Sequence, residues 1–283
     1  RNDHLPSISF GSMPNDGGNF LLSDADFNEL SQDNRKFFKK YIGSSEFING
    51  KYRYCLWLYN TDKTSYINNS YIMSIISKVK KYREESKRKA TRILANRPYL
   101  FGEIRWKNSN AIIIPSVSSE HRLYVPMGFL DSSYVISNAA MAIYNAPLWL
   151  LGLLESRMHM TWLRAVGGKL ETRYRYSAGL VYNTFPVPNL SARREKEIEN
   201  IVWKILDIRD EEGGTLAELY GSPLATKNPK PMNPRLLAAH HELDQVVDRA
   251  YRSRPFQDDN DRLSLLLNMY NEKIREQKHD EKK

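Results

Sequence analysis

The chain combines strand-like and helix-like patterns of hydrophobic positions. The clearest strand pattern is the β-branched run Ile112, Ile113 and Ile114, which is followed by a polar apex and a second apolar run from Leu123 to Phe129. We expect these runs to form a hairpin over residues 111–130. Further strands are predicted at 52–59, 101–106, 134–136, 141–144 and 180–188.

Two stretches show regular helical spacing. Residues 70–95 carry an apolar stripe that includes Ile72, Ile76 and Val79, and a second stripe runs through residues 198–206. Ser191 is a suitable N-cap for the second of these helices, and the glycine pair at 213–214 is expected to end it. Further helices are predicted at 24–41, 147–167, 216–220, 234–252 and 259–274, with a charged, frayed tail at 275–283.

Together these patterns predict an α+β fold in two parts. A mixed or antiparallel sheet domain with packed helices is expected over residues 1–188, and a small all-α domain over residues 189–283. Pro186 and Pro188, which close the last predicted strand, mark the boundary. A chain of 283 residues is long enough to bury two such cores.

Composition limits the cellular setting. No apolar run reaches the length needed to cross a membrane, and the single cysteine, Cys55, excludes an internal disulfide framework and fits a reducing cytoplasm. The first residue is Arg1 rather than Met, so we expect a fragment of a longer protein.

The charge balance favours a polyanionic partner. The formal net charge is +9, and the isoelectric point is near 9.4. Basic residues gather in two stretches, where they form either ordinary solvated faces or contacts to the phosphates of DNA. The candidates for phosphate contact are Lys78, Lys80, Lys81 and Arg88 in the first stretch, and Arg157, Arg164, Lys169, Arg173 and Arg175 in the second.

The apex of the predicted hairpin offers chemistry for reading DNA bases. Glu120 and Arg122 are two residues apart, so in an extended segment they would point the same way. Arginine donates to O6 and N7 of guanine, and glutamate accepts from N4 of cytosine, so the two could read one base pair. The alternative is a solvated hairpin tip with a weak surface ion pair. Flanking residues that could add base contacts are Ser118, Ser119, His121 and Tyr124.

No catalytic arrangement is evident. The sequence lacks a Gly-rich phosphate loop, and the adjacent His240 and His241 would point to different faces of a helix, one packed and one solvated, instead of sharing a metal. Glu85-Ser86-Lys87 matches half of a metal-dependent nuclease motif but lies in a strongly basic helical segment. We therefore predict no catalytic residues and no metal site on this chain.

Several stretches together resemble the C-terminal half of the MmeI-like (type IIL) restriction–modification enzymes, which join a nuclease, an adenine-N6 DNA methyltransferase and a target recognition domain in one polypeptide. The resemblance covers nearly the whole chain. The segments that carry it are Phe-Lys-Lys-Tyr-Ile-Gly-Ser-Ser-Glu-Phe at 38–47, Arg-Tyr-Cys-Leu-Trp-Leu at 53–58, Ile-Pro-Ser-Val-Ser-Ser-Glu-His-Arg at 114–122, Tyr-Val-Pro-Met-Gly-Phe at 124–129, Tyr-Arg-Tyr-Ser at 174–177, Val-Tyr-Asn-Thr-Phe-Pro at 181–186, Leu-Ala-Ala-His at 237–240, Leu-Asp at 243–244 and Ala-Tyr at 250–251.

The resemblance implies a target recognition module of a type II restriction–modification enzyme from a prokaryotic cytoplasm. In that family the positions matching Glu120 and Arg122 read one base pair of double-stranded DNA. Its implied partners are the methyltransferase and nuclease domains of the same polypeptide, which would use S-adenosylmethionine and Mg²⁺; neither is expected to have a complete site on this chain. Two alternatives remain open: a basic protein-interaction or specificity subunit without its own sequence readout, and an enzyme with a dispersed active site.

Overall fold

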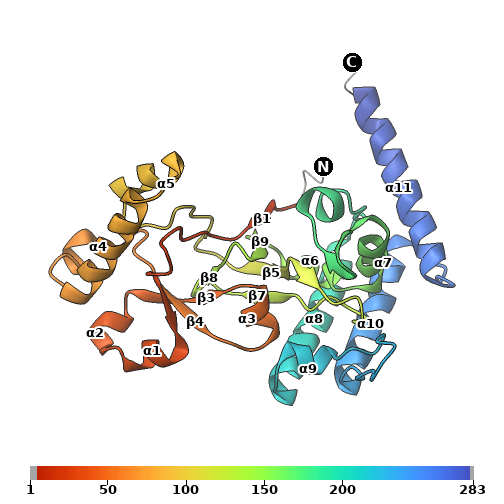
Figure 1. Ribbon diagram of the computed structural model, residues 1–283. Coiled ribbons are helices and arrows are strands. Elements are labelled where there is room, and N and C mark those ends of the chain that lie inside the picture. Colours follow the sequence, from red (N-terminus) through yellow and green to blue (C-terminus); the bar gives the residue numbers. More distant parts are fainter. Residues whose placement is uncertain (1–4, 281–283) are drawn as a thin grey trace.

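A computed structural model describes residues 5–280 of the chain. Helices α4 (Ser70–Glu84) and α5 (Lys89–Ile93) form one end of an elongated molecule, and α8 (Ala192–Glu212), α10 (Pro234–Tyr251) and α11 (Asp259–Asp280) form the other, with three small sheets between them (Figure 1). The predicted α+β class is confirmed. Within residues 5–280, no helix combines the length and the apolar character needed to cross a bilayer.

The central sheet has the order β1 (Ile8–Phe10), β9 (Ala140–Tyr144), β5 (Ala111–Pro115) and β7 (Gly128–Leu130), and all of its pairs are antiparallel. Every residue of β5 and β9 is buried, as the continuous apolar runs predict. The pairing of β5 with β7 confirms a hairpin, but its second strand starts only at Gly128, so residues 119–127 are irregular.

The second sheet has the order β2 (Leu21–Ser23), β4 (Arg53–Leu56), β3 (Phe38–Ile42) and β8 (Tyr134–Ile136). The pairs β2–β4 and β3–β4 are antiparallel, whereas β3 and β8 are parallel, so this sheet is mixed as predicted. The third sheet, β10 (Gly168–Leu170), β11 (Arg173–Arg175) and β6 (Val117–Ser118), is antiparallel.

The helix predicted over 24–41 is wrong. The segment forms two short helices, α1 (Asp24–Glu29) and α2 (Gln32–Arg35), and then the strand β3. Phe38 and Tyr41 bury their rings in the core and pair with Leu56 and Arg53 across the sheet. Pairing with strands far away in the sequence thus outweighs the local helical spacing.

Two predicted strands are also wrong. Residues 101–106 make a single bridge, between Met13 and Glu103, because the Ser12 hydroxyl accepts the backbone N–H groups of Arg105 and Trp106 where a partner strand would lie. The segment predicted as a strand at 180–188 instead begins with the π-helical turn η3 (Ala178–Tyr182), and Val181 and Phe185 enter the core at helical spacing.

Two predicted helices are broken into shorter ones. The helix over 70–95 becomes α4, α5 and the short 3₁₀ turn η2 (Leu94–Asn96), and the helix over 147–167 becomes α6 (Leu148–Leu154) and α7 (Arg157–Val166). The second break falls at Glu155 and Ser156, where the Ser156 hydroxyl accepts the backbone N–H of His159 and caps α7. The remaining short helices are α3 (Ser44–Ile48), η1 (Lys63–Ser65) and α9 (Leu216–Tyr220).

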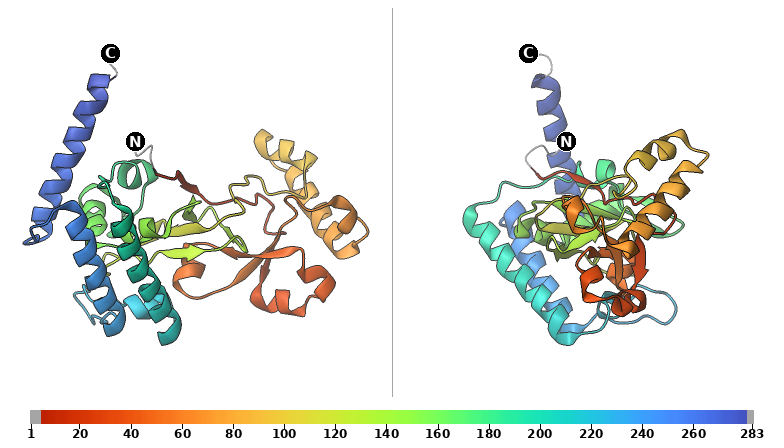
Figure 2. Two further views of the ribbon diagram at one scale, coloured as in Figure 1. Left: turned by 180° about the vertical axis from the view of Figure 1, so that it is seen from behind. Right: turned by 90° about the vertical axis from the view of Figure 1, so that its left-hand side faces the viewer.

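The C-terminal helices follow the predictions closely. Ser191 caps α8, Gly213 ends it with φ +67°, and α9 spans the predicted residues. Helix α11 continues to Asp280, beyond its predicted end at 274, and projects away from the sheets (Figure 2). The predicted frayed tail therefore lies partly within this helix, and residues 281–283 lie outside the described residues.

The largest core crosses the boundary predicted at residue 188. It joins Ile112 of the central sheet and Leu151 of α6 to Val202 of α8 and Leu243 of α10. Helices α6 and α8 approach so closely that a Cβ atom at Gly152 would lie 2.3 Å from Ile198 Cγ2. Helices α6 and α7, which precede residue 188, thus pack as part of the helical end of the molecule. The domain division at residue 188 stays a prediction.

Arg83, on the basic helix α4, is fully buried instead of lying on a solvated face. Its guanidinium donates to five backbone carbonyls, those of Pro14, Asn15, Leu94, Arg97 and Leu100, at 2.8 to 3.1 Å. Burial lowers its pKa to about 10, because a charge in a poorly solvated site is disfavoured. This one side chain joins α4 to the entry segment and to the loop beyond η2.

We predict that Arg83→Met lowers the free energy of unfolding by about 3 to 5 kcal/mol, because five buried carbonyls lose their donor. Urea denaturation measures this loss. The control is Lys80→Met, at an exposed position of the same helix, which should change stability by less than about 0.5 kcal/mol. Equal effects of the two substitutions would contradict the structural role of Arg83.

Candidate nucleic-acid interface

The apex of the hairpin is a tight turn at residues 119–122. Backbone hydrogen bonds fix the chain before and after it. The backbone N–H of Arg122 donates to Ser119 O at 3.3 Å, and that of His121 donates to the Ser119 hydroxyl at 3.2 Å. Before the turn, β6 pairs with β11, with Ser118 opposite Tyr174. After it, His121 O accepts the backbone N–H of Leu224 from the loop between α9 and α10 at 3.0 Å. Both parts of the molecule thus position the turn.

Glu120 and Arg122 lie in a turn, so the expectation that an extended backbone points them the same way is wrong. Glu120 is close to the β10–β11 hairpin, where a hydrogen bond with the Thr172 hydroxyl, aided by the charges of His121 and Arg173, lowers its pKa. Arg122 is near Tyr220; burial lowers its pKa, and its Nε has no hydrogen-bond partner within residues 5–280. The pair thus offers a carboxylate and a partly desolvated guanidinium on two sides of one turn.

Two of the predicted base contacts, Tyr124 and Ser118, are buried, which does not favour their assignment. Tyr124 is 3% exposed; its hydroxyl donates to Asp244 Oδ2 at 2.6 Å, and its ring stacks on His240 with centroids 4.3 Å apart. Ser118 is 5% exposed and lies opposite Tyr174 of β11. Neither side chain is open to solvent in this structure, so base contact by either one gains no support and stays a prediction. Ser119, Glu120, His121 and Arg122 remain at least partly accessible.

Three of the predicted phosphate contacts lie beside the turn. Lys169, Arg173 and Arg175 are exposed on β10 and β11, the hairpin that pairs with β6. Arg173 forms an ion pair with Glu171 at 2.8 Å on the exposed tip of this hairpin, where solvent weakens such pairs. The register places Arg173 and Arg175 on one face of this hairpin and Lys169, opposite Tyr174, on the other. The structure therefore brings these three cations close to the turn, which the sequence alone did not indicate.

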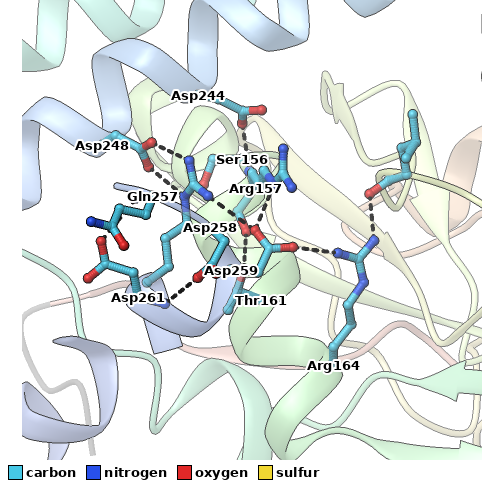
Figure 3. A network of polar contacts seen from close by, with 12 residues as sticks. Ser156, Arg157, Thr161, Arg164, Asp244, Asp248, Gln257, Asp258, Asp259 and Asp261 are labelled. Carbon is cyan, nitrogen blue, oxygen red and sulfur yellow. Dashed lines mark hydrogen bonds and ion pairs between the residues drawn. The ribbon is translucent and has the colours of Figure 1, made fainter. Parts of the chain in front are cut away.

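Arg157 and Arg164 are engaged within the protein (Figure 3). Arg157 Nε donates to Asp259 Oδ1 at 2.7 Å, and Arg164 contacts Asp259 Oδ2 at 3.5 Å and donates to Leu123 O at 3.3 Å. Arg262 also binds Asp259, at 3.1 Å. These contacts join α7 to α11 and to the segment after the turn. The prediction that both arginines contact phosphate gains no support from this arrangement.

The remaining predicted phosphate contacts lie at the other end of the molecule (Figure 1). Lys78, Lys80 and Lys81 are exposed on α4, and Arg88 is exposed where α5 begins. The pairs Lys80–Glu84 and Lys81–Glu85 are long, at 3.8 and 3.9 Å, and open to solvent, so they leave these charges largely available.

A fully buried ion pair anchors the segment that follows the turn. Glu155 Oε1 and the Arg209 guanidinium are 2.5 Å apart; Glu155 accepts the backbone N–H of Met127 at 2.8 Å, and Arg209 donates to Met127 O at 2.7 Å. Tyr220 hydrogen-bonds to Arg209 and lies 2.9 Å from His240 Nε2. Burial raises the pKa of Glu155, and the charge of Arg209 opposes that shift.

The buried histidines are structural. Burial lowers the pKa of His159 to about 3 and that of His240 well below its usual value, so both are neutral near pH 7. His241 is exposed, which confirms the prediction of one packed and one solvated histidine. Burial also raises the pKa of Asp244, the acceptor of the Tyr124 hydroxyl, to about 6. Among the described residues, no group of three or more His, Cys, Asp or Glu side chains is placed to hold a metal ion.

Sequence reasoning missed Glu155, Thr172 and Arg209. The one available signal was Glu155, a charge directly after an apolar helix, which required a partner that only the fold could supply.

The fold and surface define a sheet-and-helix module with a partly accessible turn beside a basic hairpin. Residues 1–189 match the family described as MmeI, target recognition domain, and residues 190–276 match MmeI, C-terminal domain. The chain belongs to the MmeI family.

Two relatives illustrate the membership. DNA methyltransferase A of Bacillus subtilis (strain 168) is 48% identical over 271 residues, which make up 95% of this chain and 30% of the relative. The solved structure of the type IIL restriction–modification enzyme MmeI in complex with DNA superimposes with a TM-score of 0.84 at 38% identity, covering 95% of this chain and 35% of that one. The chain thus spans about a third of the length of these proteins.

We predict that Glu155→Gln and Arg209→Met each cost about 3 to 5 kcal/mol of stability, because each leaves one buried charge or its acceptors unpaired. The double variant should lose less than the sum of the two, since no lone charge remains. Chemical denaturation of the four proteins gives the coupling energy. Arg235→Met, which removes an exposed arginine that also pairs with glutamates, is the control and should cost less than about 1 kcal/mol. Additive losses would refute the coupling.

Proposed function

We propose that this chain is the sequence-specific target recognition module of a restriction–modification protein and that it reads double-stranded DNA. The observation that carries this proposal is the fold: 95% of the chain matches a restriction–modification enzyme that was solved in complex with DNA. The net charge of +9 suits a polyanionic ligand.

The turn at residues 119–122 is the proposed base-reading element. Arg122 has a guanidinium that is partly desolvated, and within residues 5–280 it forms no ion pair, so an acceptor from a base edge would offset the cost of its burial. Glu120 has a lowered pKa, which keeps it charged as an acceptor for N4 of cytosine. Ser119 and His121 flank the pair, and Lys169, Arg173 and Arg175 would hold the adjacent phosphates.

We further propose that the chain is not catalytic by itself. It spans 30% of DNA methyltransferase A, and the rest of such a protein would hold the reactive sites. Methyltransferase and nuclease domains of the same polypeptide, using S-adenosylmethionine and Mg²⁺ in a prokaryotic cytoplasm, would then act at the sequence that this module selects.

Exchanging the two charges of the turn, Glu120→Arg with Arg122→Glu, should change the preferred base pair at one position of the bound site. Each bidentate contact discriminates by about 1 to 3 kcal/mol against the wrong base. The measurement is selection from a randomised duplex pool at low and moderate salt.

The matched control for this selection is the exchange Glu103→Arg with Arg105→Glu, because this exposed pair has the same spacing and lies away from the turn. It should leave the selected sequence unchanged. A motif that survives the exchange at 120 and 122, or duplex binding without any motif, would refute base reading by this pair; binding without a motif would favour a basic protein-interaction module.

Replacing Lys80, Lys81 and Arg88 with glutamine should weaken binding to all duplex sequences alike. For every phosphate that the variant no longer neutralises, the slope of log K against log salt should become shallower by about 0.9. The control replaces Arg193, Lys196 and Lys204 of α8, which are exposed and cost the same charge. An unchanged salt slope in the first variant would show that α4 and α5 do not touch the DNA backbone.

A further inference from the structure

A second surface of aromatic and basic residues lies away from the turn at 119–122. We call it the aromatic patch and define it by Tyr59 and Trp106 with Lys36, Lys39, Arg105 and Lys107. Trp106 lies before the N-terminal end of β5. The turn at 119–122 follows β6, beyond the C-terminal end of β5. The patch and the turn therefore occupy opposite ends of the central sheet.

The rings of the patch are held in a fixed arrangement. Trp106 packs against Trp57 with centroids 5.8 Å apart and against Tyr59 at 6.4 Å, both edge to face. Its indole N–H donates to Ser132 O, which also accepts from Lys39. Tyr59 is nevertheless 37% exposed, and Trp106 is partly exposed. Large rings that are rigid and still reach solvent suit stacking with a planar ligand.

A hollow of about 300 Å³ lies on each side of these two rings. Lys36 and Lys39 line the first hollow, and Arg105 and Lys107 line the second; the linings contain no acidic residue. Within residues 5–280, neither Lys36 nor Lys107 forms an ion pair, and the Lys39 ammonium lies 4.8 Å from the Trp106 ring centroid. Arg105 pairs with Glu103 at 2.7 Å, so the patch combines π surfaces with positive charge that, among the described residues, is free of ion pairs at Lys36 and Lys107.

Each hollow is also lined by a buried side chain whose polar atom has no partner. Trp57, 5% exposed, borders the first hollow, and its indole N–H has no hydrogen-bond partner within residues 5–280. Tyr144, 7% exposed, borders the second, and its hydroxyl likewise has none in that part of the chain. Buried polar groups are normally hydrogen-bonded, and both atoms are themselves shielded from solvent, so they are unsatisfied donors beneath the hollows and not direct ligand contacts.

We propose that the aromatic patch binds unstacked nucleotides of single-stranded nucleic acid. Bases stack on Trp106 and Tyr59, and the lysines hold the phosphates on either side. Inorganic phosphate would leave the rings unused, and the closed stack of a duplex would offer them no base face. This site is independent of the duplex recognition proposed for the turn.

The test is binding of a labelled oligothymidylate of about twelve nucleotides, a length within the usual range for a single-strand site, followed by fluorescence anisotropy with the full chain. Tyr59→Ala and Trp106→Ala should each weaken binding about tenfold, the loss of one stacked base. Lys36→Glu with Lys107→Glu should weaken it further and flatten the salt dependence.

Two controls match these variants. Trp203→Ala removes an indole that is 50% exposed on α8, and Lys196→Glu with Lys204→Glu changes the same charge on that helix. Both should bind the oligothymidylate as the unaltered chain does. If Trp106→Ala loses its fold by circular dichroism, Tyr59→Ala and the lysine pair still decide the matter.

The proposal is overturned if the unaltered chain does not bind the oligothymidylate, or if the patch variants bind it as well as the controls. The exchange at Glu120 and Arg122 should leave this affinity unchanged. A duplex motif without single-strand binding would refute the patch alone, and the reverse result would refute the turn alone.

Discussion

The buried ion pair between Glu155 and Arg209 is the constraint on which the candidate interface depends. Two charges removed from water are tolerable only when each completes the hydrogen bonding of the other, and here both also hold the backbone of Met127. Glu155 lies between α6 and α7, Arg209 on α8, and Met127 at the end of the segment that follows the turn. The position of the turn is therefore coupled to the helical end of the molecule.

Several other arginines also bind carbonyls or carboxylates within the protein. Part of the net positive charge is therefore not available to a ligand. Arg83 satisfies five carbonyls, Arg262 joins α11 to Asp248 of α10, and Arg157 and Arg164 share Asp259. These guanidiniums stabilise contacts between elements that are distant in sequence. The positive charge that remains available includes that of the β10–β11 hairpin, of α4 and α5, and of the aromatic patch, so the charge open to polyanions is smaller than the composition indicates.

Regular helices and buried strands could be predicted from sequence because their signals are local. The apolar stripe and Ser191 cap define α8, and the continuous apolar runs define β5 and β9. Prediction failed where a distant partner decides the backbone. Residues 38–42 form a strand because β4 and β8 pair with them, and residues 101–106 stay irregular because the Ser12 hydroxyl takes their amide hydrogens.

The features of the candidate site also fall into two groups: those that the sequence determined and those that only the tertiary structure decided. The sequence by itself determined the α+β class, most helices, the basic character and the family to which the turn at 119–122 belongs. Only the tertiary structure decided that this segment turns instead of extending, that Tyr124 and Ser118 are buried, and that Lys169, Arg173 and Arg175 lie beside it. The physical reason is that burial and pairing of a polar side chain depend on acceptors and donors far away in the sequence, such as Asp244 for Tyr124, 120 residues apart. Periodicity carries no information about such partners.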